Sequence, residues 1–151
     1  MAVTASNPLL ALQQRARDIL AATPALETCK IFIEDKEGLE FTLSKGLGTL
    51  EQPVILIGSA DGAETAANMG ALTLRETLAI ALLYRPLFGA DGAPLPSDLL
   101  SAIITALHQA PIDPANTGLG APYFRVTGHA AGESGAGTVQ YGITLTAPLA
   151  L

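Results

Sequence analysis

The sequence predicts an α+β domain in which a single mixed or antiparallel β-sheet is flanked by two helices. Two segments, 8–22 and 97–109, carry apolar residues at helical spacing. Several short segments instead alternate apolar and polar residues, as half-buried strands do. The expected order is α-β-β-β-β-α-β-β, in which strands come in runs, and this favours α+β over a doubly wound sheet. With 151 residues and neither a linker nor an internal repeat, residues 1–151 are expected to form one domain.

The first helix is expected over residues 8–22. Asn7 suits the N-cap and Pro8 the first helical position. Thr23 and Pro24 should end the helix, because the residue before a proline avoids the helical region. Its apolar stripe consists of Leu9, Leu12, Ala16 and Ile19.

Two kinds of strand are expected next. Residues 29–44 predict a hairpin that turns at 35–38, and 45–52 reads as a loop. The unbroken apolar run 54–57, which follows Pro53, is typical of a central strand buried on both faces. Residues 58–71 have hardly any large apolar side chain, so they predict a long loop.

Residues 72–85 are compatible with two structures. Thr73 to Glu76 match a helix capping box, yet Leu74, Leu78, Ile80, Leu82 and Tyr84 fall on one face of a strand. The strand is preferred, as a long neighbour of 54–57.

The second helix is expected at 97–109 with Ser97 as its N-cap, followed by a Gly/Pro loop at 111–122. Two strands then close the chain, around 123–127 and 138–145. The segment 128–137 between them contains four glycines and predicts a floppy hairpin tip.

Composition indicates an assembly protein. Charged residues make up only 15% of the chain, so burial between copies is preferred over a monomer covered with Ala, Gly, Thr and Ser. The net charge of −6 and the absence of a basic run argue against binding to nucleic acid or anionic membranes. No targeting or membrane-spanning segment is recognised, so a soluble protein that stays where it is made is expected. The single Cys29 is interpreted as a buried structural thiol, which is compatible with a reducing cytoplasm.

No motif for catalysis, a cofactor or a metal is found. The glycines at 58–62 lack the lysine of a phosphate loop, and Gly118 and Gly120 run into Pro122 instead of a helix. His108 and His129 are far apart in sequence, and a metal site at His129 is disfavoured. The expectation is a protein that is not an enzyme and needs no cofactor.

The layout of elements resembles the phage tail terminator (tail completion) family. An amphipathic helix at 9–21 precedes a short strand, and an apolar strand at 53–57 ends in Gly58. A long strand ending in Arg85 and Pro86 leads to the helix at 97–109, and 138–145 forms the last strand. The hairpin at 29–44 and the length of 58–71 depart from the family pattern.

This resemblance implies a virion protein at the head–tail junction. Its partners would be copies of itself in a hexameric ring, the tail tube protein and the head connector, with DNA passing through the lumen without specific binding. The expected inter-subunit residues are Arg75, Glu76, Arg85 and Arg125. The expected contacts along the ring axis are Gly58, Asp61, Glu64, Asn68, His129, Glu133 and Ser134.

Three alternatives stay open. Another connector, a stopper or a tail tube subunit would use a similar sheet, and a small ligand-binding domain could cradle an apolar molecule on it. An enzyme whose residues form no recognisable motif is the third. The sequence does not decide the host, the tail type or the ring size.

Overall fold

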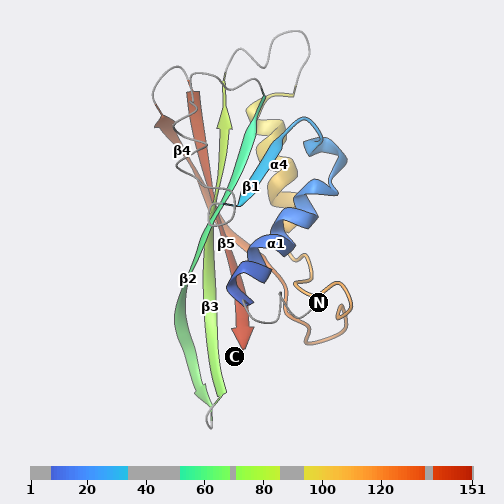
Figure 1. Cartoon of the computed structure of the whole chain (residues 1–151), viewed down its shortest axis with the longest axis vertical. Helices are drawn as coiled ribbons and strands as arrows, with labels where there is room; N and C mark the ends of the chain where they lie inside the picture. The colour runs from blue at the N-terminus through green and yellow to red at the C-terminus, as the bar shows by residue number, and fades with distance from the viewer. Residues whose placement is uncertain (1–7, 34–51, 69–70, 86–93, 135–137, 151) are drawn as a thin grey trace.

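A computed structural model describes residues 8–33, 52–68, 71–85, 94–134 and 138–150. Its elements are α1 (Pro8–Ala21), the 3-10 helix η1 (Pro24–Leu26), β1 (Lys30–Ile33), β2 (Val54–Asn68), β3 (Ala71–Tyr84), α4 (Pro96–Leu107), β4 (Arg125–Ser134) and β5 (Thr138–Ala150) (Figure 1).

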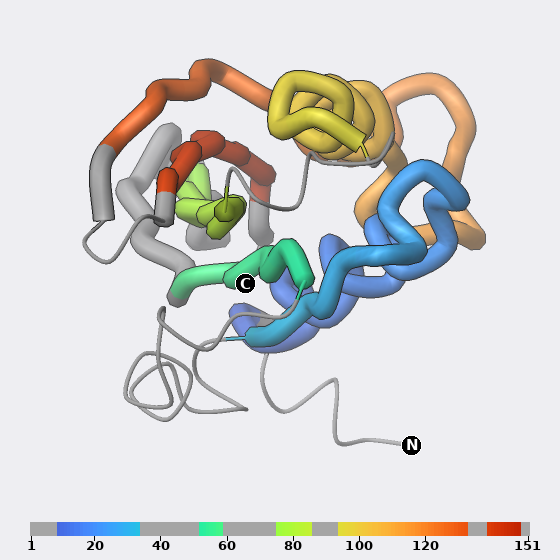
Figure 2. The backbone as a smooth tube through the Cα atoms, turned by 90° about the horizontal axis from the view of Figure 1, so that it is seen from above, coloured from blue at the N-terminus to red at the C-terminus, as the bar shows by residue number. Residues whose placement is uncertain are grey.

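The five strands form one mixed sheet in the order β1-β2-β3-β5-β4. β1 pairs with β2 in parallel, and all other neighbours are antiparallel. α1 and α4 lie side by side on one side of this sheet (Figures 1 and 2). The predicted α+β class, with a single sheet and two helices, is therefore confirmed.

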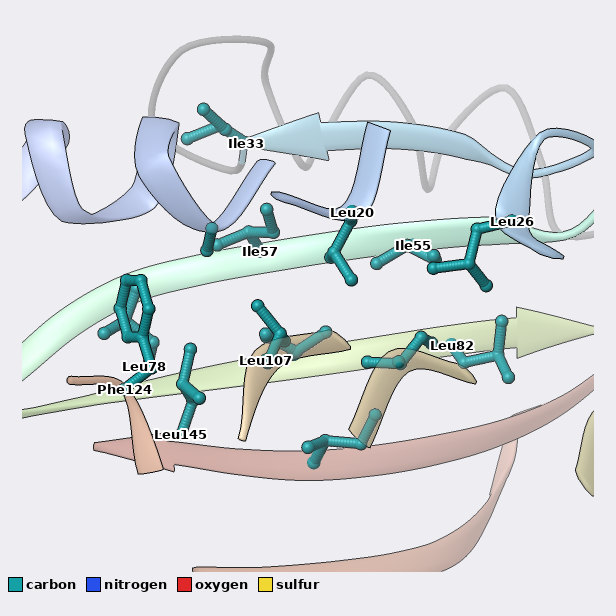
Figure 3. Close-up of a cluster of buried hydrophobic side chains, with 14 of the residues drawn as sticks. Leu20, Leu26, Ile33, Ile55, Ile57, Leu78, Leu82, Leu107, Phe124 and Leu145 are labelled. Carbon is teal, nitrogen blue, oxygen red and sulfur yellow. The ribbon is translucent and has the colours of Figure 1, made fainter. Parts of the chain in front are cut away.

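The hydrophobic core lies between the sheet and the helices. Figure 3 shows its side chains converging from both layers, with Leu20 of α1 and Leu107 of α4 lying against Ile55, Ile57 and Leu82 of the sheet. These side chains are no more than 2% exposed. Every second residue of a strand faces the helices. The apolar residues that alternate with polar ones in the sequence are therefore the ones that are buried in the core.

The first four residues of β2 are buried on both faces of the sheet, as predicted. Ile55 and Ile57 face the helices, whereas Val54 and Leu56 join Leu83 of β3 in a second cluster on the opposite face. The parallel register of β1 against β2, from Lys30 opposite Val54 to Ile33 opposite Ile57, makes this a central strand.

The segment predicted as a loop at 58–71 is instead strand for most of its length. β2 continues to Asn68 and pairs with β3 until Asn68 lies opposite Ala71. Two register shifts, between Ile57 and Ala60 and between Glu64 and Ala66, interrupt the ladder. Small residues carry little strand propensity of their own, so the pairing with β3 decides their conformation.

The prediction of a floppy, glycine-rich hairpin tip at 128–137 is also wrong, because here too the pairing with a neighbouring strand decides the conformation. β4 runs through to Ser134 and β5 starts at Thr138, so only residues 135–137 separate the two strands. A register shift between Val126 and Gly128 marks a bulge near the start of β4. Glycine weakens a strand without preventing it from pairing with a regular neighbour.

Residues 71–84 form the strand that was preferred over a helix. β3 pairs with β2 on one side and with β5 on the other, from Thr73 opposite Ala150 to Tyr84 opposite Val139. Two full ladders outweigh the helical propensity of its Leu, Ala, Arg and Glu residues.

The helices match their predicted positions with one correction. The N-cap of α4 is Leu95 with Pro96 next to it, not Ser97, and the Asp98 carboxylate accepts the Leu95 N–H at 3.0 Å. At the end of α1, the Thr23 hydroxyl donates to the Ile19 carbonyl at 2.8 Å. Of the hairpin predicted at 29–44, β1 is present and residues 34–44 lie outside the described residues.

Gln13 of α1 is a polar side chain in the core and is only 1% exposed. Its amide nitrogen donates to the Gly58 carbonyl at 2.8 Å, next to the first register shift of β2. The shift interrupts the ladder here, and the side chain of α1 supplies a hydrogen bond to the strand.

We expect Gln13→Met to lower the free energy of unfolding by about 1–3 kcal/mol, because it keeps the volume and removes a buried hydrogen bond. Urea unfolding would measure this loss. Gln14→Met, at the half-buried neighbouring position, is the matched control and should change stability by less than about 0.5 kcal/mol. Equal losses in both variants would contradict this role of Gln13.

Candidate assembly surface

The sheet face opposite α1 and α4, here called the open face, carries small side chains on much of β3, β4 and β5, whereas Val54, Leu56 and Leu83 form a buried apolar cluster on another part of it. Residues opposite one another in the register share a face, so Thr77, Thr146 and Arg125 lie together across three strands. The other described positions of this face on β3, β5 and β4 include Ala79, Ala81, Gly142, Thr144, Gly128, Ala130 and Gly132. Few of these side chains carry a charged or polar group that could bind a small ligand.

Arg75 and Arg125, two of the predicted inter-subunit residues, meet at one pocket of about 200 Å³. The pocket is lined by Arg75, Tyr123, Arg125, Thr146, Ala147 and Pro148. The strand register explains the arrangement, since Arg75 lies opposite Pro148 and Arg125 opposite Thr146 of the intervening strand β5. Both arginines are exposed, and the described residues that line the pocket include no carboxylate.

A larger hollow of about 570 Å³ adjoins this pocket and shares Tyr123 and Arg125 with it. The segment after α4 builds it, because Gln109 has a φ of 62° and turns the chain back towards Phe124. The Gln109 N–H donates to the Phe124 carbonyl at 2.8 Å, and the Phe124 N–H donates to Ala110 at 2.9 Å.

His108, at the end of α4, is tied to the start of β4. The Val126 N–H donates to His108 Nδ1 at 3.1 Å, so Nδ1 is an acceptor and the neutral ring carries its proton on Nε2. Together these contacts fix one wall of the hollow to the sheet.

Within the described residues, the outer side of β4 has no strand partner. Thr127, His129, Ala130, Ala131 and Gly132 are exposed there. In the described part of the chain, the far part of β2 is a second such edge, because β1 pairs only with residues 54–57. The two edges belong to opposite sides of the sheet, and the segments contain few of the charged residues and none of the prolines that commonly protect an edge.

The remaining predicted inter-subunit residues do not join the arginine pocket. Glu76 is 2% exposed and faces the helix side, so it is buried within the chain itself. Arg85 is half-buried and follows β3 at the end far from Arg75.

The residues predicted to make axial contacts in loops all lie in strands. Gly58, Asp61, Glu64 and Asn68 belong to β2, and His129, Glu133 and Ser134 belong to β4. The sequence pattern indicated that these segments are polar, but it did not indicate that they pair as strands with β3 and β5.

Few of the described side chains could bind a metal ion or act as a nucleophile. Among the described residues no cluster of His, Cys, Asp and Glu could hold a metal ion. Burial raises the pKa of the Cys29 thiol, which a hydrogen bond with Thr28 partly offsets, so the reactive thiolate is disfavoured. Burial also raises the pKa of Tyr84, whose hydroxyl donates to the Pro94 carbonyl at 2.9 Å.

Sequence reasoning missed Tyr123, Thr146 and Pro148 as part of the arginine pocket. Arg75 and Arg125 are 50 positions apart, and only the insertion of β5 between β3 and β4 brings them to one pocket. No helix among the described residues has the length and apolar character needed to cross a membrane.

Comparison with solved structures finds similar chains, whereas the sequence comparisons find none. No family model matches the sequence, and no curated protein does so significantly. A solved structure described as the virion of a native gene transfer agent particle contains a similar chain, with a TM-score of 0.61 and 15% identity. The match covers 100% of both chains. With an identity of 15%, this match shows that the two chains share a fold.

Proposed function

We propose that this chain is a structural virion protein, and specifically a tail terminator. Copies of it close into a ring, a hexamer as in the tail terminator family, and this ring caps the tail tube, ends tube polymerisation and joins the tail to the head connector. The observation that carries this proposal is the fold match over the full length of both chains to a chain of a gene transfer agent virion.

The sheet edges support the ring. Among the described residues, β4 and the far part of β2 lack a further strand partner on opposite sides of the sheet, so the edge of one copy can pair with the other edge of the next. A contact between two different surfaces repeats around a closed ring when its rotation closes. Such pairing would also satisfy backbone groups that are otherwise left to solvent.

The hairpins support contacts along the ring axis. The β2–β3 hairpin and the β4–β5 hairpin point to opposite ends of the long sheet (Figure 1). In the proposed ring, Asn68 at one end and Ser134 at the other would face the tube and the connector. The net charge of −6 suits a lumen through which DNA passes without specific binding.

The proposal predicts closed rings of one size. We expect native mass spectrometry and negative-stain electron microscopy of the purified chain to show a sixfold ring, and added rings to stop growth of the cognate tail tube. Long tubes formed by the chain alone would identify a tube subunit instead. A monomer that carries a small molecule would support the ligand-binding alternative and contradict the proposal.

A further inference from the structure

We infer that β4 of one copy pairs antiparallel with residues 58–68 of β2 in the next copy, in a register that sets Ala130 opposite Ala63. The inference rests on the proposed ring and adds the direction and the register of the contact that closes it. It starts from the two edges of the sheet, β4 and the far part of β2, that lack a further strand partner among the described residues.

The directions of the strands within one copy determine the direction of the contact. β2 and β5 both pair antiparallel with β3, and β4 pairs antiparallel with β5, so β2 and β4 run in opposite directions. Rotation about a ring axis preserves the direction of each strand relative to that axis, so β4 meets the β2 of the next copy in the antiparallel sense. The contact is then an antiparallel ladder, with hydrogen bonds perpendicular to both strands.

The lengths of the two edges limit the register. β2 has 15 residues, of which β1 pairs with 54–57, so 58–68 remain open among the described residues. β4 has 10 residues, nearly the length of this open part. When the two edges lie side by side, the end of β4 at Ser134 comes next to β1, and Arg125 comes next to Asn68. A shift of two residues in one direction would bring Ser134 against β1, and in the other it would carry Arg125 past the end of β2.

The two faces of the sheet distinguish this register from its neighbours. Ala63 lies opposite Arg75 and Ala130 lies opposite Gly142, so both positions belong to the open face. Both also lie in stretches that have no register shift. A change of one residue would set the open face of one copy against the helix side of the next, because side chains alternate along a strand. With Ala63 opposite Ala130, the open face continues from copy to copy.

β1 excludes a contact that has no offset along the strands. Within one copy, Ile143 and Ile80 place His129 level with Ile57. β1 already pairs with Ile57. A next copy at the same height would therefore bring most of β4 against β1 instead of against the open part of β2.

The contact consequently shifts the next copy along the strands. Through Thr146, Arg125 is level with Thr77 of β3, whereas Asn68 is level with Ala71. Placing Arg125 beside Asn68 moves the next copy by about six residues, or about 20 Å. Figure 1 shows the feature that makes this offset possible, the β2–β3 hairpin that extends beyond the start of β4.

The offset determines how far the strands tilt in a closed ring. One copy adds four strand spacings from its β2 to the β2 of the next copy, or about 19 Å, because β1 lies in line with the incoming β4. A step of about 19 Å across the strands and about 20 Å along them returns to the same height when the strands tilt by about 45° from the ring axis, the upper end of the range for closed barrels. Untilted strands would instead give an open helix.

Disulfide trapping tests the register. In a Cys29→Ser background, Ala63→Cys with Ala130→Cys should link neighbouring copies under mild oxidation, because opposite residues of an antiparallel pair have Cα atoms about 4.5–5.5 Å apart. β3 and β5 separate the two positions within one copy, so a link inside the chain is excluded. A denaturing gel should show a series of linked multimers that ends at the size of the ring.

Ala67→Cys with Ala130→Cys is the matched control. Position 67 lies about 10 Å along the strand from Ala63, which is beyond the reach of a disulfide in the inferred register. Its linked fraction should equal that of the single-cysteine variants. Reduced samples are first checked for rings by electron microscopy. Should the first pair prevent rings, Gly62→Cys with Ala131→Cys takes its place, because these positions form the next rung of the same register.

The other outcomes separate the register from the proposed function. Wild-type rings with links in the control pair only, or in neither pair, would overturn the register and leave the ring intact. Amides of residues 60–64 that exchange no faster in the diluted monomer than in the ring would show that this edge is covered within the chain, and the contact would be wrong. A wild-type chain that stays monomeric at every concentration would overturn both proposals.

Discussion

A proline whose nitrogen faces outward from β4 is expected to prevent ring closure while leaving the fold intact. Along an edge strand, alternate N–H groups point to the neighbouring strand and to the open side. Proline has no N–H, so at an outward position it removes a group that only another copy can use, and it is tolerated there within the chain. The expected change is a shift from rings to folded monomers, with a melting temperature that falls only by the contribution that assembly makes.

Ala130 and Ala131 offer the matched pair for this experiment. Both are exposed and adjacent in β4, opposite Gly142 and Tyr141 of β5, so one N–H faces β5 and the other faces the open edge. Of Ala130→Pro and Ala131→Pro, one should lose about 1–3 kcal/mol of stability through the broken β4–β5 ladder. The other should keep the β4–β5 ladder and lose the ring.

Native mass spectrometry and thermal unfolding of both variants would check this expectation. The informative protein is the one of the two that keeps the higher melting temperature, because its β4–β5 ladder is intact. Rings that persist in that variant would show that the open edge of β4 does not pair between copies, and the ring would then have to depend on other surfaces.

Phe124→Ala is expected to lower the free energy of unfolding by about 3–5 kcal/mol, the usual cost of emptying a large buried site. Phe124 is 0% exposed and packs with Leu107 and Leu145 in the core shown in Figure 3. The backbone hydrogen bonds of residue 124 with Gln109 and Ala110 can also form when the residue is alanine. The measured loss of stability should therefore come from the missing side chain.

Urea unfolding at one fixed protein concentration would measure this loss, since assembly makes stability depend on concentration. Leu119→Ala is the control: Leu119 is 109% exposed, so its removal should change stability by less than about 0.5 kcal/mol. A loss below about 1 kcal/mol for Phe124→Ala would contradict the packing described for the segment that follows α4.

Strong local patterns were sufficient to predict most of the framework. The helix at α1 is set by its apolar spacing and by Pro24 just beyond it, and the run Val54 to Ile57 identifies a strand buried on both faces. The strand at β3 was predicted because its larger apolar residues alternate, even though its residues favour helix. In each case the segment carries enough apolar side chains for its periodicity to show.

The segments that were predicted incorrectly are those with small side chains. The far part of β2 and the middle of β4 are mostly Gly, Ala, Ser and Thr, which give neither a helical nor a strand period. Their conformation depends on β3 and β5, the regular strands beside them. Pairing between distant segments cannot be inferred from the composition of one of them.

The same division holds for the candidate site. The sequence by itself determined the fold class, the central strand and the scarcity of charge, because these follow from periodicity and composition. Only the tertiary structure decided that Arg75 and Arg125 share a pocket, that Glu76 is buried and that β4 is an open edge. The physical reason is that strand order and register place residues from distant segments together, and neither is encoded in any one segment.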